Sequence, residues 1–142
     1  IGGKTDIVMM LNGALAGLVA ITAEPLTPGP ITAMIIGSIG AVIMYYGTKL
    51  LENFGLDDVV GAIPVHMFAG IFGTLVVPLT NADTSFGTQL IGVISVCVFS
   101  FVLSWITFST LKSTVGLRIS RAAEKQGTDK AEVGVIAYSI RD

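Results

Sequence analysis

The chain has 142 residues, of which 52% are hydrophobic and only 13% are charged. Because soluble domains carry about twice that share of charged residues, the composition predicts a membrane protein. A net charge of −2 argues against nucleic-acid binding, and the single cysteine, Cys97, excludes an internal disulfide and a cysteine-rich metal site. The opening IGGKTD has neither an initiator methionine nor the pattern of a signal peptide, so we expect a piece of a longer protein.

Four apolar runs follow one another and are separated by short polar or proline-rich turns. A bilayer needs about 20 apolar residues in a helix, and the runs meet or approach that length. They cover residues 7–23, 31–51, 59–79 and 86–111. The sequence therefore predicts an all-α polytopic membrane protein, with four transmembrane helices in residues 1–112.

Small residues recur within the first two runs at helical spacing. Gly13 and Gly17 are four apart in the first run, and Gly37 and Gly40 mark the second. This spacing lets membrane helices touch backbone to backbone, so we expect a close-packed bundle. The fourth run has larger side chains and is expected to face lipid, with Trp105 as an interface anchor.

The lysines and arginines all fall on alternate sides of the four runs. Lys4 precedes the first run, Lys49 lies at the end of the second run on the side where the third begins, and the other six follow the fourth. The positive-inside rule then puts the start of the first helix and the tail, residues 113–142, in the cytoplasm. The expected localisation is the cell membrane, with a multi-pass chain. The mixed charges of the tail are typical of a solvated surface, with a short helix around Ser120 to Gln126 and a break at Gly127.

The only histidine, His66, lies within the third run. In a soluble helix it would usually be a packed core residue, whereas at membrane depth an ionisable side chain is by default a functional-site hypothesis. On a 3.6-residue period we expect its face to form a tight apolar slot. The residues expected on that face are Ala62, Ile63, Ala69, Gly70, Gly73 and Val77.

The residues before His66 indicate where its helix begins. Pro64 cannot donate a backbone hydrogen bond, so the helix starts near Ile63 or is kinked there. Asp57 and Asp58 are expected to cap the positive end of the helix dipole, with a direct role in chemistry as the alternative.

Three motifs resemble the family of ammonium transporters, which also includes the methylammonium permeases and Rhesus proteins. They are NGALAGLVAIT at residues 12–22, LDDVVGAIPVHMFAGIFGTL at residues 56–75, and VGLR at residues 115–118 with Ala137 and Tyr138 after it. The resemblance implies the last third of an eleven-helix subunit, its eighth to eleventh helices, in a homotrimer with one pore per subunit. It implies ammonium or ammonia as the substrate, no cofactor or metal, and no enzyme activity.

The resemblance also assigns residues. It makes His66 the second member of a twin-histidine pair, puts Leu15 at the apolar pore wall, and puts Ala62 and Ile63 near the pore. It implies that PII-type signalling proteins can block the pore at the cytoplasmic face. The chain departs from many bacterial members, which have aspartate at Gly61, histidine at Val133 and an acidic run at residues 121–123.

Desolvation of ammonium in an apolar slot is costly, and no acid lies on the expected face of His66. A neutral imidazole has one donor and one acceptor, so it can hold ammonia or relay a proton. We therefore expect ammonium to lose its proton and ammonia to cross. Two alternatives stay open. One is a membrane protein that senses ammonium and signals through its tail. The other is a haem-ligating electron-transfer subunit whose second ligand comes from outside this chain.

Overall fold

The computed structural model describes residues 5–136, and all regular secondary structure in that range is helical. Lys4, Ala137, Tyr138 and Arg141, which carried part of the sequence argument, lie outside the described residues. The chain divides into two compact units, residues 1–97 and 98–142, which are described separately. The prediction of an all-α chain is confirmed for the described part.

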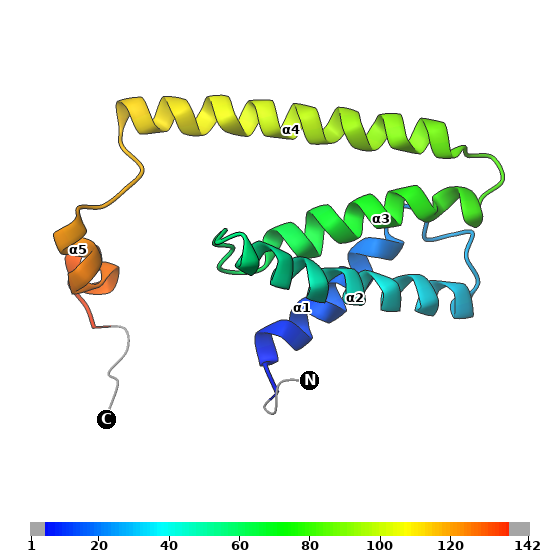
Figure 1. Ribbon diagram of the computed structural model, residues 1–142, viewed down its shortest axis with the longest axis horizontal. Coiled ribbons are helices and arrows are strands. Elements are labelled where there is room, and N and C mark those ends of the chain that lie inside the picture. Colours follow the sequence, from blue (N-terminus) through cyan, green and yellow to red (C-terminus); the bar gives the residue numbers. More distant parts are fainter. Residues whose placement is uncertain (1–4, 137–142) are drawn as a thin grey trace. The chain divides into compact units, whose positions relative to one another are not determined.

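The elements follow the expected order (Figure 1). The first unit contains α1 (Ile7–Ile21), α2 (Pro30–Asn53), η1 (Ile63–Phe68), α3 (Ala69–Val76), η2 (Val77–Leu79) and the start of α4 (Phe86–Thr114). The second unit contains the rest of α4, α5 (Arg121–Gln126) and η3 (Asp129–Val133). The elements η1, α3 and η2 form one continuous helical segment, Ile63–Leu79, which is called the His66 helix below.

Local sequence explains where the first two helices begin. Asp6 precedes α1, and its Oδ1 accepts a hydrogen bond from the backbone N–H of Met9 at 3.0 Å. The helix α2 begins at Pro30, whose missing N–H is not needed in a first turn and whose fixed φ suits a helix. Both starts are typical of the signals that these residue types give in sequence.

Two helices of the described chain, α2 and α4, are long and apolar enough to cross a membrane. The helix α1 and the His66 helix are apolar but shorter. The helix α2 extends through Lys49, whose Nζ lies 3.0 Å from Oε2 of Glu52 one turn later. The number of spans stays a prediction.

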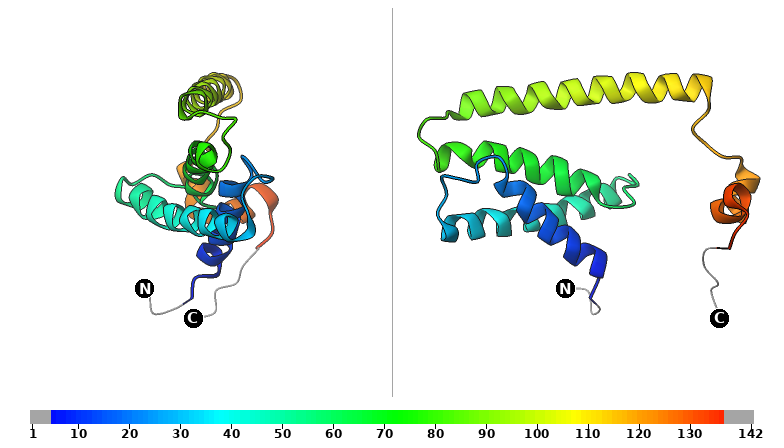
Figure 2. Two further views of the ribbon diagram at one scale, coloured as in Figure 1. Left: turned by 90° about the vertical axis from the view of Figure 1, so that its right-hand side faces the viewer. Right: turned by 180° about the vertical axis from the view of Figure 1, so that it is seen from behind.

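The core of the first unit lies where α1, α2 and the His66 helix pack together (Figures 1 and 2). Ala16 and Ala69 are fully buried, and Met44 and Val65 are 2% exposed. Most of the contact residues are small, so the backbones of the helices approach one another closely. A side chain on Gly17 would be 3.1 Å from the carbonyl oxygen of Gly37.

The contact between α1 and the His66 helix is the tightest of this kind. A Cβ on Gly73 would collide with the carbonyl oxygen of Ala20 and would lie 2.8 Å from its carbonyl carbon. On the other side of α1, a Cβ on Gly40 would lie 2.6 Å from Cβ of Ala20 and 2.9 Å from the carbonyl oxygen of Ala16. Ala20 is thus held between α2 and the His66 helix.

The second unit has the short helix expected in the tail. Ser120 caps α5, with its Oγ accepting from the N–H of Ala123 at 3.2 Å, and the helix ends before Gly127. Gly127 has a φ of +96° and Gly134, which ends η3, has a φ of +74°. Side chains other than glycine rarely adopt these angles, so the tail has two defined turns. Trp105, in the part of α4 that belongs to this unit, is 65% exposed.

We expect Gly73→Ala to lower the free energy of unfolding by about 1–3 kcal/mol, the usual cost of overpacking against atoms that cannot move aside. Thermal unfolding in detergent, followed by circular dichroism, measures the effect. Gly92→Ala is the matched control, because Gly92 is also helical and a Cβ added there would have nothing within 4 Å. Equal melting temperatures for the two variants would contradict the packing of Gly73 on Ala20.

Candidate functional site

The start of the His66 helix is held by the carboxylate of Asp58. Its Oδ1 accepts from the backbone N–H of Ala62 at 2.9 Å, and its Oδ2 accepts from the N–H of Ile63 at 2.8 Å. Asp57 is exposed, and the described residues show no side-chain hydrogen bond to it. The cap that we expected from the pair of aspartates is therefore made by Asp58. With both oxygens engaged by backbone donors, Asp58 acts as a helix cap.

The turn between Asp58 and the helix depends on Gly61. Gly61 has a φ of +73°, which lets its N–H reach the carbonyl of Asp58 at 3.1 Å while its own carbonyl accepts from Val65 at 3.2 Å. A side chain at this position would be strained and would lie 2.6 Å from Nδ2 of Asn12. Asn12, on α1, instead donates that amide group to the carbonyl of Val60 at 3.0 Å.

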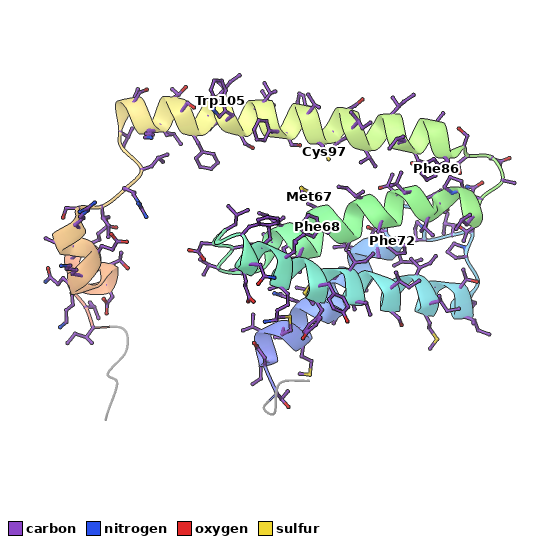
Figure 3. All side chains as sticks on the ribbon, in the orientation of Figure 1. Met67, Phe68, Phe72, Phe86, Cys97 and Trp105 are labelled. Carbon is purple, nitrogen blue, oxygen red and sulfur yellow. The ribbon has the colours of Figure 1, made fainter. Side chains whose placement is uncertain are left out.

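The first six residues of the His66 helix form a π-helical turn, in which the N–H of Ala69 reaches the carbonyls of His66 and Pro64. Single π-helical turns inside α-helices are frequent at functional sites. The turn packs on α2, because Phe68 and Pro64 lie over Gly47, where a Cβ would collide with the Phe68 ring. Met67, next to His66, is 45% exposed and points away from α2 (Figure 3).

The face that we predicted around His66 is divided in the structure. Ala69, Gly73 and Val77 are buried against the bundle, whereas His66 and Ala62 are exposed. The buried series is Val65, Ala69, Gly73 and Val77, which repeats every four residues. The residues predicted to share a face with His66 therefore differ in burial, and the helix begins with a wider turn than the uniform 3.6-residue period that the prediction assumed.

All four side chains predicted at a pore lie on the surface of this chain. His66 and Ala62 are exposed, Leu15 is 48% exposed and Ile63 is 37% exposed. Their neighbours Pro64 and Val65 are buried. The tight slot around His66 is thus not built by the described residues. Within residues 5–136, no group of three or more His, Cys, Asp or Glu side chains could hold a metal ion.

Two polar contacts of this region did not emerge from the sequence. Asn12, within the first half of α1, donates to the carbonyl of Val60, and Asn81, just after the His66 helix, donates to Oε2 of Glu24 at 2.8 Å. The only sequence signal for the first was an amide side chain within an apolar run, which identifies a polar contact but not its partner.

The model of the Ammonium Transporter Family matches residues 1–138, nearly the whole chain. The chain belongs to this family. Its members are transporters rather than enzymes, as the resemblance implied. The motif residues that carried the resemblance, including Asn12, Asp58, Gly61 and His66, lie within the matched range.

Several curated relatives are similar over almost the full chain. The ammonium transporter Amt2 of Archaeoglobus fulgidus is 39% identical over 96% of this chain and 33% of its own length. Amt2 of Methanocaldococcus jannaschii is 34% identical, over 97% of this chain and 35% of its own. An ammonium transporter of Corynebacterium glutamicum is 31% identical, over 97% and 34%. The chain thus spans about a third of the length of these relatives.

We expect Asp58→Ala to lower the free energy of unfolding by about 0.5–2 kcal/mol, because two backbone N–H groups lose their acceptor. Asp57→Ala is the matched control and should change that free energy by less than about 0.5 kcal/mol, as exposed side chains usually do. Chemical unfolding in mixed micelles would compare the two variants. If Asp57→Ala is the more damaging, the assignment of the cap is wrong.

Proposed function

We propose that this chain is the C-terminal part of an ammonium transporter subunit, and that His66 and its exposed neighbours form one wall of an ammonia-conducting pore. The observation that carries the proposal is the exposure of His66. The helix packs through Val65, Ala69 and Gly73, yet its only titratable side chain lies outside that packed face. An ionisable residue left at the surface of an apolar helix needs a partner or a wet cavity.

The residues around His66 favour ammonia over ammonium as the species that crosses. Ammonium would have to lose its hydration beside Ala62, Ile63 and Leu15, which offer no compensating charge. The nearest carboxylate along the chain, Asp58, already accepts two backbone hydrogen bonds. In this proposal ammonium therefore passes its proton to the histidine pair, and the neutral ammonia crosses the wall.

A neutral imidazole suits the next step. One ring nitrogen accepts a hydrogen bond and the other donates one, so His66 can contact ammonia or pass a proton to a second histidine. The second histidine is supplied, in this proposal, by a part of the subunit outside this chain.

The proposal extends to assembly and regulation. We infer four spans out of eleven, three subunits in a complete transporter with one pore each, and a multi-pass location in the cell membrane. The cytoplasmic tail is proposed to dock on the transporter and to form part of a PII-type binding face. The glycine turns at Gly127 and Gly134 support a defined tail shape. An ammonium sensor is the second candidate function, which measured flux would disfavour.

The proposed topology predicts that residues 24–30 and 80–85 lie outside and that residues 52–56 and the tail lie inside. Single cysteines at Thr27, Asn53 and Asn81, in a Cys97→Ser background, should report this through an impermeant thiol reagent on intact cells. Thr27→Cys and Asn81→Cys should be labelled, and Asn53→Cys only after permeabilisation. The opposite labelling pattern would reverse the orientation.

For His66 we expect His66→Ala to leave the yield of assembled transporter near normal, because the side chain is exposed and its removal opens no buried cavity within this chain. Ammonium flux per transporter should change, or potassium should be admitted, because an open and wetter wall no longer requires deprotonation. Flux or current in proteoliposomes, normalised to transporter content, measures both.

The matched control for that experiment is Met67→Ala. Met67 is the adjacent residue and is exposed, but it cannot carry a proton. It should keep potassium exclusion intact. Equal flux and equal potassium exclusion in wild type and His66→Ala would show that His66 is not a pore residue.

A further inference from the structure

We propose that Asn12 is a positioning residue for the pore. Its hydrogen bond to the carbonyl of Val60 determines where the His66 helix begins and therefore where His66 lies relative to α1. Asn12 itself has no contact with the substrate in this proposal. The functional part rests on the proposed role of His66, and the structural part stands on the contacts of Asn12 alone.

This bond is one of two side-chain hydrogen bonds that join distant segments of the described chain. Asn12 and Val60 are 48 residues apart, and Asn81 and Glu24 are 57 apart. Asn12 lies in the first half of α1 and Val60 precedes the His66 helix, whereas Glu24 follows α1 and Asn81 follows the helix. The two hydrogen bonds therefore join α1 and the His66 helix, one before the start of the His66 helix and one after its end.

Backbone hydrogen bonding explains why the carbonyl of Val60 depends on a side chain. In the i→i−4 pattern of a helix, the donor for residue 60 would be the N–H of residue 64. Residue 64 is Pro64, which has no N–H. The carbonyl of Val60 therefore has no donor from its own helix, and Asn12 supplies one at 3.0 Å.

The shape of the turn makes this donor specific. Nδ2 of Asn12 occupies the space in which a side chain at Gly61 would lie, only 2.6 Å from its Cβ position. Gly61 also carries the positive φ that starts the helix. The amide thus packs on the turn as well as bonding to it. Because the turn directs the next residues, a shift at Val60 is carried to His66.

The same amide is close in sequence to the other proposed wall residue. Leu15 follows Asn12 by one helical turn on α1, and both His66 and Leu15 are exposed. A bond between Asn12 and the start of the His66 helix therefore fixes the two wall residues in one register. A displacement of about 1 Å is enough to impair a positioned group.

The test compares Asn12→Leu with Asn81→Leu in the complete transporter. Leucine keeps the branched shape of asparagine and removes the donor, so each variant breaks one of the two hydrogen bonds. We expect Asn12→Leu to lower the maximal ammonium flux per transporter about fivefold, the factor given by one net hydrogen bond, with little change in the concentration for half-maximal flux. Asn81→Leu should keep the maximal flux within about twofold of wild type. Asn12→Gln, which keeps an amide donor, should restore part of the flux.

A role in overall stability alone would make the two leucine variants behave alike. Unchanged flux in Asn12→Leu, or an equal loss in Asn81→Leu, overturns the proposal. If Asn12→Leu yields no assembled transporter, Asn12→Ser replaces it, because a hydroxyl is too short to keep the bond at its present length but is a mild change for the helix.

Hydrogen exchange read by mass spectrometry tests the structural part without transport. Asn12→Leu should speed amide exchange in residues 58–66 and leave residues 70–79 unchanged, whereas Asn81→Leu should leave residues 58–66 unchanged. Unaltered exchange in residues 58–66 of Asn12→Leu refutes the positioning role. If the wild-type transporter carries no ammonium, the proposed function fails, and the exchange measurement still decides whether Asn12 positions the helix.

Discussion

The backbone of α1 lies directly against α2 and the His66 helix, and the rest of the first unit depends on this contact. Gly73 and Gly40 approach Ala20 from two sides, and no larger side chain fits at either glycine. In lipid, helices gain little from hiding apolar surface from one another, so close van der Waals contact of small residues is the main source of association. Such contacts fix the distance between helices but, being apolar, they resist sliding along the helix axis less strongly.

Two side-chain hydrogen bonds, one before and one after the His66 helix, supply the resistance to axial sliding that the small residues lack. Asn12 bonds to Val60 before the His66 helix, and Asn81 bonds to Glu24 beyond its other end. Each bond is directional, so the pair defines the axial position of the two helices while the glycines define their separation. These interactions involve only the packed face and the two ends of the His66 helix, so they leave its exposed face without packing partners in the first unit.

The sequence predicted the helical class, the order of the apolar segments, an aspartate cap from the pair Asp57 and Asp58, and a helix start or kink near Ile63, because each follows from local chemistry. It did not predict the split face around His66. A wider π-helical turn changes the angular period, and Phe68 and Pro64 of that turn pack on Gly47, a contact between segments distant in sequence. The partner of Asn12 could not be predicted either, because it is distant in sequence and an amide in an apolar run can bond to any nearby carbonyl.

Charge at the start of the His66 helix is confined to its cap, and this restricts what the exposed face can bind. The carboxylate of Asp58 faces two backbone N–H groups at the positive end of the helix. From Ile63 to Leu79 the only titratable residue is His66. A cation moving along this face meets no carboxylate that could replace its hydration, whereas a neutral molecule loses little free energy on leaving water there. The helix thus combines an anchored, charged start with an uncharged face, and this supports the proposal that the deprotonated substrate crosses at His66.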